Sequence, residues 1–414
     1  MRQYCTAMNK DSTIGIKTLT GGVTAPGGFV AGGVMCGVRN TGRRDLGLLF
    51  SEHGCTAAAV FTRNVVKGAP LEVTRGAVGS GGARAVVVNS GYANAATGRK
   101  GLEDAYAMQA FAASALRIEA GEVAVASTGV IGEHLPMDKI SAGIEVVAAD
   151  LGRDGAGFAE AILTTDTRIK EAAVRVEIGG TTVTVGGTAK GSGMIHPNMG
   201  TMLAFLTTDA AVEKGCLQET LRKVTERTFN RVTVDGDTSP SDLAILLANG
   251  AAGGGTLTLD SPAWSVFARA VEEVARSLAK EIARDGEGAT RLVEVDVEGA
   301  KDEASAAALA RSVVGSNLVK AAVFGEDANW GRVLTAIGYS GVNFEPNDVE
   351  LWFGPVKVFA DGEPVPHEVA EANAALSSGE VTVTARLNEG DASAAAWGCD
   401  LTYEYVRING SYRT

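Results

Sequence analysis

Short runs of β-branched and other apolar residues alternate along the chain with longer stretches in which apolar positions recur every three or four residues. Glycine or polar turn residues bound each short run, which is typical of strands. The predicted strands are 85–89, 123–126, 174–178, 182–185 and 292–297. The longer stretches have the spacing of amphipathic helices. The predicted helices are 102–118, 137–151, 217–229, 263–284, 303–314 and 368–376.

Strands that alternate with helices predict an α/β protein and exclude an all-helical or all-β one. Gly179 and Gly180 separate two of the predicted strands, so this pair indicates a hairpin and favours mixed or antiparallel sheets. We therefore expect a layered arrangement of the αββα type, with a smaller α/β lobe at the C-terminal end. A change of composition after the helix that ends near Arg284 places the start of this lobe at about residue 285.

Composition and charge restrict the partners that the protein can have. Of the 414 residues, 45% are hydrophobic and 21% are charged, which is typical of a globular chain. The net charge is −12 and the sequence has no concentrated basic stripe, so a nucleic-acid partner is not expected. Apolar runs fall short of the roughly 20 residues that span a bilayer, and the first residues lack the apolar core of a secretory signal. We expect no membrane partner and a cytoplasmic location.

Cysteine and histidine are too scattered to indicate a disulfide framework or a metal site. The five cysteines include no C-x-x-C pair, and the four histidines show no ligand-like spacing. We expect reduced, mostly packed thiols and no bound metal. The residues concerned are Cys5, Cys36, Cys55, Cys216, Cys399, His53, His134, His196 and His367.

The most informative stretch is residues 190–203, which read KGSGMIHPNMGTML. Glycines, a proline and an asparagine force an irregular backbone just before an apolar run that reads as a buried strand beginning at Thr201. Without other information, these residues favour a glycine-rich turn into a core strand, with Thr201 merely packed, over a reactive hydroxyl at a strand end. A phosphate-binding loop is excluded, because Lys190, Gly191 and Ser192 reverse the G-K-[ST] order of that motif.

KGSGMIHPNMGTML resembles the self-processing signature of the ornithine acetyltransferases, which are also called glutamate N-acetyltransferases. Other segments are similar to landmarks of the same family, so the resemblance covers essentially the whole chain. They are GGVTAPGGF at 21–29, NSGYAN at 89–94, STGVIG at 127–132, VDGDT at 234–238, DGEGAT at 285–290, FGEDANWGR at 324–332 and YVRIN at 405–409. The family more often has alanine at the position of Gly200 and asparagine at that of Tyr92. Gly200 puts no Cβ beside the attacked bond, whereas Tyr92 is expected to alter the shape of the site.

The resemblance implies that the chain cuts itself between Gly200 and Thr201, giving an α chain of residues 1–200 and a β chain of residues 201–414. Thr201 would be the nucleophile, and its freed α-amine, with a pKa near ~8, would be the base. The family's donors to the oxyanion correspond to Thr128 and Gly129. Without the resemblance, this threonine and glycine would read as a turn at a strand end.

The resemblance also implies a set of substrate contacts. Lys190 and Glu287 carry opposite charges, which suit a substrate with an α-carboxylate and a side-chain ammonium. Taken alone, Lys190 reads as a solvated surface lysine and Glu287 as a carboxylate at a helix end, while a C-terminal tail is usually frayed. The implied contacts are Thr164, Lys190, Thr201, Glu287, Asn409 and Thr414.

The implied reaction moves an acetyl group from N2-acetyl-L-ornithine to L-glutamate through an acetyl-Thr201 intermediate, a ping-pong step of the cyclic arginine pathway. No cofactor is expected, and acetyl-coenzyme A as a second donor and a role in specialised metabolism are left open. Two α and two β chains are expected to assemble. The alternatives are an N-terminal-nucleophile amidase or aminopeptidase, which gives the acyl group to water, and a non-catalytic metabolite-binding protein, whose chain stays whole.

Overall fold

The computed structural model describes residues 15–39, 42–80, 82–196 and 202–411. Gly200, Thr201 and Thr414, which the sequence predicts to belong to the site, lie outside these residues, as does Cys5. Within the described ranges the strands form three sheets, which we name the central, the outer and the C-terminal sheet.

The central sheet has six strands and is mixed. Its order along the sheet is β1 (Lys17–Leu19), β7 (Lys170–Ile178), β8 (Thr181–Lys190), β9 (Leu203–Thr208), β10 (Leu243–Ala248) and β4 (Thr56–Phe61). β9 and β10 are parallel, and the other neighbours are antiparallel. Gly179 and Gly180, both with positive φ, form the tight turn between β7 and β8, so the predicted hairpin is confirmed.

The outer sheet packs face to face on the central sheet. Its order is β2 (Phe29–Val34), β3 (Leu46–Ser51), β5 (Ala85–Tyr92) and β6 (Val123–Val130). Only β5 and β6 are parallel within it. The helices that accompany these two sheets are α1 (Pro70–Ser80), α2 (Gly98–Leu116), α3 (Met137–Ala149), α4 (Ala156–Ala161), α5 (Lys214–Arg227) and α6 (Trp264–Arg284).

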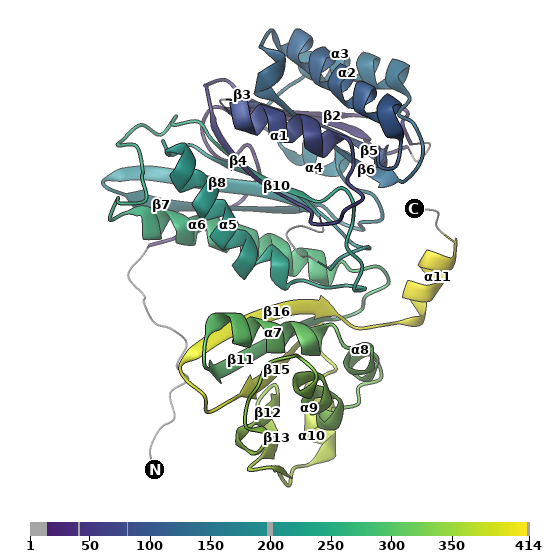
Figure 1. Ribbon diagram of the computed structural model, residues 1–414, viewed down its shortest axis with the longest axis vertical. Coiled ribbons are helices and arrows are strands. Elements are labelled where there is room, and N and C mark those ends of the chain that lie inside the picture. Colours follow the sequence, from purple (N-terminus) through teal and green to yellow (C-terminus); the bar gives the residue numbers. More distant parts are fainter. Residues whose placement is uncertain (1–14, 40–41, 81, 197–201, 412–414) are drawn as a thin grey trace.

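Alternation of side chains along the strands creates a stack of apolar cores, between the layers of helices and sheets that Figure 1 shows. Val87 on β5 faces α2 and α3, whereas its neighbour Val88 faces the central sheet. Phe205 on β9 faces the outer sheet, whereas Leu206 faces α5 and α6. Each sheet is therefore apolar on both faces, one face covered by helices and the other by the partner sheet. The αββα layering predicted from the sequence is confirmed.

The C-terminal sheet has a core of its own and forms the smaller α/β lobe (Figure 1). Its order is β14 (Glu363–Pro364), β13 (Val356–Ala360), β12 (Glu350–Phe353), β15 (Glu380–Arg386), β11 (Leu292–Ala300) and β16 (Ala392–Cys399). The helices of this part are α7 (Glu303–Val314), α8 (Asn317–Phe324), α9 (Trp330–Gly338) and α10 (Val369–Ala374). The last helix, α11 (Tyr403–Ser411), leaves β16 and returns towards the two packed sheets.

Every strand and helix that the apolar pattern predicts is present, with ends shifted by a few residues. The strand after residue 200 starts later than predicted, because β9 begins at Leu203 and Met202 lies in a bend. The predicted start at Thr201 is therefore too early. Of the cysteines in the described ranges, Cys216 and Cys399 are buried and Cys36 and Cys55 half-buried, and all four are free thiols.

No single helix among the described residues is both long and apolar enough to cross a membrane. α7 and α8 meet the criterion only as a pair, with a bend of 56° between them. Their apolar side chains, among them Leu309, Val313 and Val323, are buried in the core of the C-terminal sheet.

Candidate functional site

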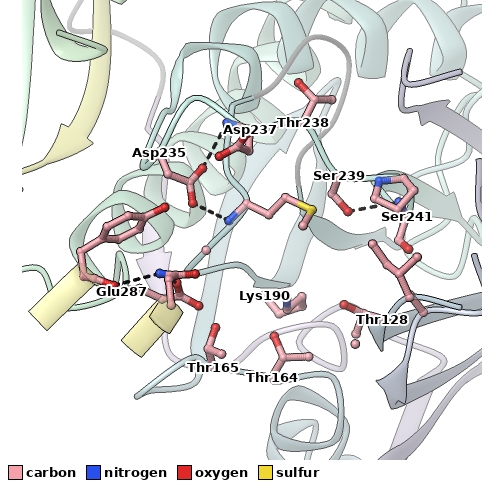
Figure 2. Close-up of a pocket in the computed structure, with 18 residues that line it drawn as sticks. Thr128, Thr164, Thr165, Lys190, Asp235, Asp237, Thr238, Ser239, Ser241 and Glu287 are labelled. Atoms are coloured by element: carbon pink, nitrogen blue, oxygen red, sulfur yellow. Dashed lines mark hydrogen bonds between the residues drawn. The ribbon is translucent and has the colours of Figure 1, made fainter. Parts of the chain in front are cut away.

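A cavity of about 360 Å³ lies at the edge where β6 of the outer sheet and β8 of the central sheet both end (Figure 2). The segment 235–241, the turn after α6 and the helix α11 close its other sides. Every predicted site residue that the structure describes lines this cavity. These residues are Thr128, Gly129, Thr164, Lys190, Glu287 and Asn409.

The backbone at Gly129 has a conformation that requires glycine. Its φ is +131°, and a Cβ at this position would lie 2.3 Å from the carbonyl carbon of Gly91 on the paired strand β5. A side chain would therefore push β5 and β6 apart. Thr128 and Gly129 lie just before the end of β6, beside the cavity, which is where a hydroxyl and a backbone N–H could face a developing negative charge.

Lys190 is buried rather than solvated, with 7% of its surface exposed. Burial lowers the pKa of its ammonium, and the carboxylate of Asp166, 4.0 Å away, opposes that effect. Asp166 also accepts the backbone N–H groups of Thr164 (3.0 Å) and Gly191 (2.7 Å). The Asp166 carboxylate thus holds both the backbone at Thr164, which forms a wall of the cavity, and the Lys190 ammonium, which points into it.

Asp166 belongs to a buried ionic cluster behind the cavity. The Lys170 ammonium donates to Asp166 and to Asp285, at 2.6 Å in each case. Although burial raises the pKa of Asp166, Lys170 and Lys190 hold it well below its usual value. The charged carboxylate therefore stabilises the fold above the ordinary aspartate pKa, and this stabilisation is lost as the pH falls towards the lowered value.

Glu287 and Asn409 meet at the cavity from distant parts of the sequence. Glu287 follows α6 and is 7% exposed, and Asn409 on α11 donates from Nδ2 to its Oε2 at 2.8 Å. Burial, together with Asp235 and other carboxylates, raises the pKa of the neighbouring Tyr405. The C-terminal segment is therefore an ordered wall of the site up to Ser411 and not a frayed tail.

Asp235 anchors the chain that leads towards residue 197. Its two carboxylate oxygens accept the backbone N–H groups of Met194 (2.7 Å) and Ile195 (2.8 Å). Thr238 Oγ1 donates to the carbonyl of His196 at 2.8 Å. The motif VDGDT at 234–238 thus holds the motif KGSGMIH in place. The sequence marked both segments, but it could not show that one binds the other.

A second, smaller cavity of about 20 Å³ adjoins the first and is also lined by Thr128 and Lys190. Met202, the first described residue after the gap at 197–201, lines it too. The carbonyl of Met202 accepts the N–H of Leu243 at 2.9 Å, so this end of the chain is fixed by β10. The chain before residue 197 and the chain after residue 201 therefore both lie beside the smaller cavity.

Tyr92, where the family more often has asparagine, is expected from the sequence to alter the shape of the site. In the structure it lies beside the cavity and does not line it. Ala93 lines the cavity instead, and the Tyr92 carbonyl accepts a hydrogen bond from Asn89 Nδ2 at 3.0 Å. In the described part of the chain, no three His, Cys, Asp or Glu side chains are grouped in a way that could hold a metal ion.

Comparison with known proteins identifies a family over nearly the whole chain. The model of the ArgJ family matches residues 30–414. The chain belongs to the ArgJ family. The resemblance found in the sequence is thereby confirmed at the level of the family.

Two curated relatives carry the name arginine biosynthesis bifunctional protein ArgJ. That of Symbiobacterium thermophilum is 56% identical over 96% of this chain and 99% of its own length. That of Bacillus subtilis is 51% identical over 96% of this chain and 98% of its own length. The crystal structure of the protein of the same name from Bacillus halodurans is 47% identical, with a TM-score of 0.50, over 51% of this chain and the whole of that one.

Proposed function

We propose that this member of the ArgJ family is an acetyltransferase of arginine biosynthesis that moves acetyl from N2-acetyl-L-ornithine to L-glutamate. The observation that carries the proposal is the cavity, where residues from distant segments of the chain meet beside both ends of the segment containing Thr201. Family membership and the names of the relatives support the same reaction. Thr201, Thr128, Gly129, Thr164, Lys190, Glu287, Asn409 and Thr414 have in this proposal the roles that the sequence predicts.

Self-cleavage between Gly200 and Thr201 is part of the proposal. A cut at this point divides the 414 residues into two nearly equal chains. The solved chain from Bacillus halodurans is matched over its full length by only 51% of this sequence, whereas the curated relatives match 96% of it. A half-length chain in the crystal of a family member is what a cut at this point would produce.

The transfer uses the new N-terminus as both nucleophile and base. The α-amine accepts the proton of the Thr201 hydroxyl while its oxygen attacks the acetyl carbonyl of the donor. Thr128 and Gly129 donate to the resulting oxyanion. The amine then returns the proton to the departing ornithine nitrogen, leaving an acetyl ester on Thr201. Attack by the amine of glutamate reverses these steps, so the reaction needs no cofactor.

Charges around the cavity suit amino-acid substrates. The Lys190 ammonium can pair with an α-carboxylate, and Figure 2 shows the carboxylates of Glu287 and Asp235 across the cavity from Thr128 and Ser241. Both oxygens of Asp235 are already engaged by backbone N–H groups. Glu287 has a single side-chain donor, Asn409, among the described residues, and its buried carboxylate is therefore the better partner for a substrate ammonium.

Asp166→Asn and Asp285→Asn are expected to differ in substrate binding but not in stability. Each removes one carboxylate from the buried Lys170 ammonium, so the free energy of unfolding should fall by about 3 kcal/mol in both. Only Asp166 also contacts Lys190 and Thr164, so KM for N2-acetyl-L-ornithine should rise about tenfold in Asp166→Asn alone, as expected when a charged hydrogen bond is weakened. Denaturant unfolding and steady-state kinetics measure the two effects. Equal KM values in the two variants would show that Asp166 does not act through Lys190.

Dependence on glutamate separates a transferase from a hydrolase built on the same nucleophile. With N2-acetyl-L-ornithine alone, the enzyme should release at most one ornithine per site, because the acetyl ester waits for an acceptor. Added glutamate should start turnover and yield N-acetylglutamate, measured by chromatography. Steady acetate release that is unaffected by glutamate would instead identify an amidase. A chain that binds these metabolites without turnover would identify a binding protein.

The same proposal includes acetyl-coenzyme A as a second acetyl donor, an assembly of two α and two β chains, and a cytoplasmic location. A thioester carbonyl can be attacked by the same hydroxyl, and the relatives are named bifunctional. Labelled acetyl-coenzyme A should then yield labelled N-acetylglutamate. Native mass spectrometry should show two copies of each half-chain.

A further inference from the structure

Two neighbouring residues at one end of the site each have a buried polar atom with no partner. Ser241 is 7% exposed and Asp242 2%, and neither the Oγ of Ser241 nor the Oδ2 of Asp242 has a hydrogen-bond partner among the residues that the structure describes. Buried polar atoms in folded proteins are nearly always satisfied. An unpaired one beside a cavity therefore indicates that a ligand completes it.

Only one of these two side chains reaches the main cavity. Ser241 lines both the main cavity of about 360 Å³ and the smaller one of about 20 Å³, whereas Asp242 lines the smaller cavity alone. The smaller cavity exceeds the roughly 10–15 Å³ that one water requires, but it is too small for an amino acid. A water can serve Asp242 there, so the Ser241 hydroxyl is the unpaired group that a substrate can reach.

The backbone on both sides of the Ser241 hydroxyl is held in place by hydrogen bonds. The N–H of Ser241 donates to Ser239 Oγ at 3.2 Å. The carbonyl of Pro240 accepts the N–H of Gly68 at 3.0 Å, which ties this segment to the chain that follows β4. The hydroxyl is therefore presented from a fixed backbone, and a ligand that binds it has little ordering to induce.

Charges around the main cavity indicate which part of a substrate the Ser241 hydroxyl meets. Lys190 lines both cavities together with Ser241. The carboxylates of Glu287 and Asp235 lie across the main cavity from Ser241, as Figure 2 shows. The end at Ser241 and Lys190 therefore attracts a carboxylate and repels an ammonium. A hydroxyl suits this end, because it donates a short, strong hydrogen bond to a carboxylate.

We infer that the Ser241 hydroxyl binds the α-carboxylate of the substrates together with the Lys190 ammonium. The inference rests on the proposed function, in which N2-acetyl-L-ornithine and L-glutamate both carry this group. Ser241 donates a hydrogen bond to one carboxylate oxygen, and Lys190 supplies the opposite charge. The acetyl donor and the acetyl acceptor share this contact, whereas Glu287 binds the side-chain ammonium of ornithine alone. Ser241 is thus a specificity-determining residue and takes no proton during the transfer.

Steady-state kinetics of Ser241→Ala on the cut protein test the shared contact. KM should rise about tenfold for N2-acetyl-L-ornithine and for L-glutamate alike, the scale of a lost hydrogen bond to a charged group, with kcat nearly unchanged. Thr225→Val is the matched control, because Thr225 is also buried with an unpaired hydroxyl but lies on α5, outside both cavities. It should keep the wild-type KM values. A fall in kcat at unchanged KM in Ser241→Ala would overturn the inference.

Inhibition by L-ornithine and by putrescine separates a carboxylate contact from a loss of packing. Putrescine is ornithine without its α-carboxylate and keeps both amines. Ser241→Ala should raise the inhibition constant of L-ornithine about tenfold and leave that of putrescine unchanged. An equal rise for the two inhibitors would show that Ser241 shapes the site without contacting the carboxylate, and this result would also overturn the inference.

A crystal structure of the wild-type enzyme with L-ornithine tests the contact directly, even if Ser241→Ala fails to fold or to be cut. A carboxylate oxygen of the ligand is expected within hydrogen-bond distance of Ser241 Oγ and of Lys190 Nζ. A protein group or a water bonded to Ser241 Oγ in place of the carboxylate would overturn the inference and leave the proposed function intact. If the wild-type enzyme neither binds L-ornithine nor transfers acetyl to L-glutamate, the proposed function itself fails.

Discussion

Replacement of Thr201 by alanine is expected to leave the chain whole at 414 residues and to abolish acetyl transfer. The hydroxyl that cuts the chain and the hydroxyl that carries the acetyl group are the same in our account, so one substitution removes both steps. The loss should reach the assay background, a reduction of at least ~10⁴-fold, which is the scale of losing a nucleophile. Intact mass and N-acetylglutamate formation measure the two effects.

Thr201→Ser is the matched control for this variant. Serine keeps the hydroxyl and loses only a methyl group, so the chain should still be cut and should retain measurable transfer. Lys190 and Thr128 flank this region and stay unchanged in both variants. An alanine variant that is cut, or that transfers acetyl while whole, would remove Thr201 from the mechanism.

Thr128→Val is expected to have the second-largest effect. Valine preserves the branched shape at this buried position but removes the hydroxyl that we assign to the oxyanion, and loss of one such donor costs about 10²–10³-fold in kcat. KM should change little, because the donor acts mainly in the transition state. Steady-state kinetics on the cut fraction of the variant give both constants.

Serine at position 128 provides the control for the hydroxyl. Thr128→Ser keeps a donor on the same backbone and should lose much less activity than Thr128→Val. Thermal unfolding should differ little among the three proteins, since the branched side chain is only 8% exposed and valine fills the same space. If valine and serine reduce kcat equally, packing and not the hydroxyl is what matters at this position.

Local signals predicted the elements of this fold well. The hairpin at Gly179 and Gly180 follows from two residues that tolerate positive φ, and α6 and α7 follow from their helical spacing. The start of β9 was predicted two residues too early, because Thr201 and Met202 fit the apolar run although the Met202 carbonyl already pairs with Leu243. Pattern alone does not show at which residue the pairing with β10 begins.

The supporting residues of the site could not be predicted from the sequence. Asp166 contacts Gly191 and Lys170, and Asp285 joins it across more than a hundred residues of chain. Read alone, Lys190 appeared as a surface lysine, and only the folded sheets show that it is buried. Such roles arise from burial and pairing between distant segments, which a linear pattern does not contain.

The family resemblance predicted more of the site than physical pattern did. It brought Thr128, Glu287 and Asn409 into one hypothesis although they come from three distant elements, and the structure places all three on one cavity. The roles of these residues stay predictions until they are measured. Thr201 and Thr414 lie outside the described residues, so their part in the site depends on experiment.

The most direct test of the account is to find the acetyl group on the enzyme. The purified protein is mixed with N2-acetyl-L-ornithine in the absence of glutamate, quenched with acid, digested and mapped by mass spectrometry. We predict one acetyl group on Thr201 at the N-terminus of the chain 201–414, released by hydroxylamine as an ester and lost when glutamate is added. Acetyl on another residue, or full activity in a chain that remains uncut at Thr201, would contradict the account.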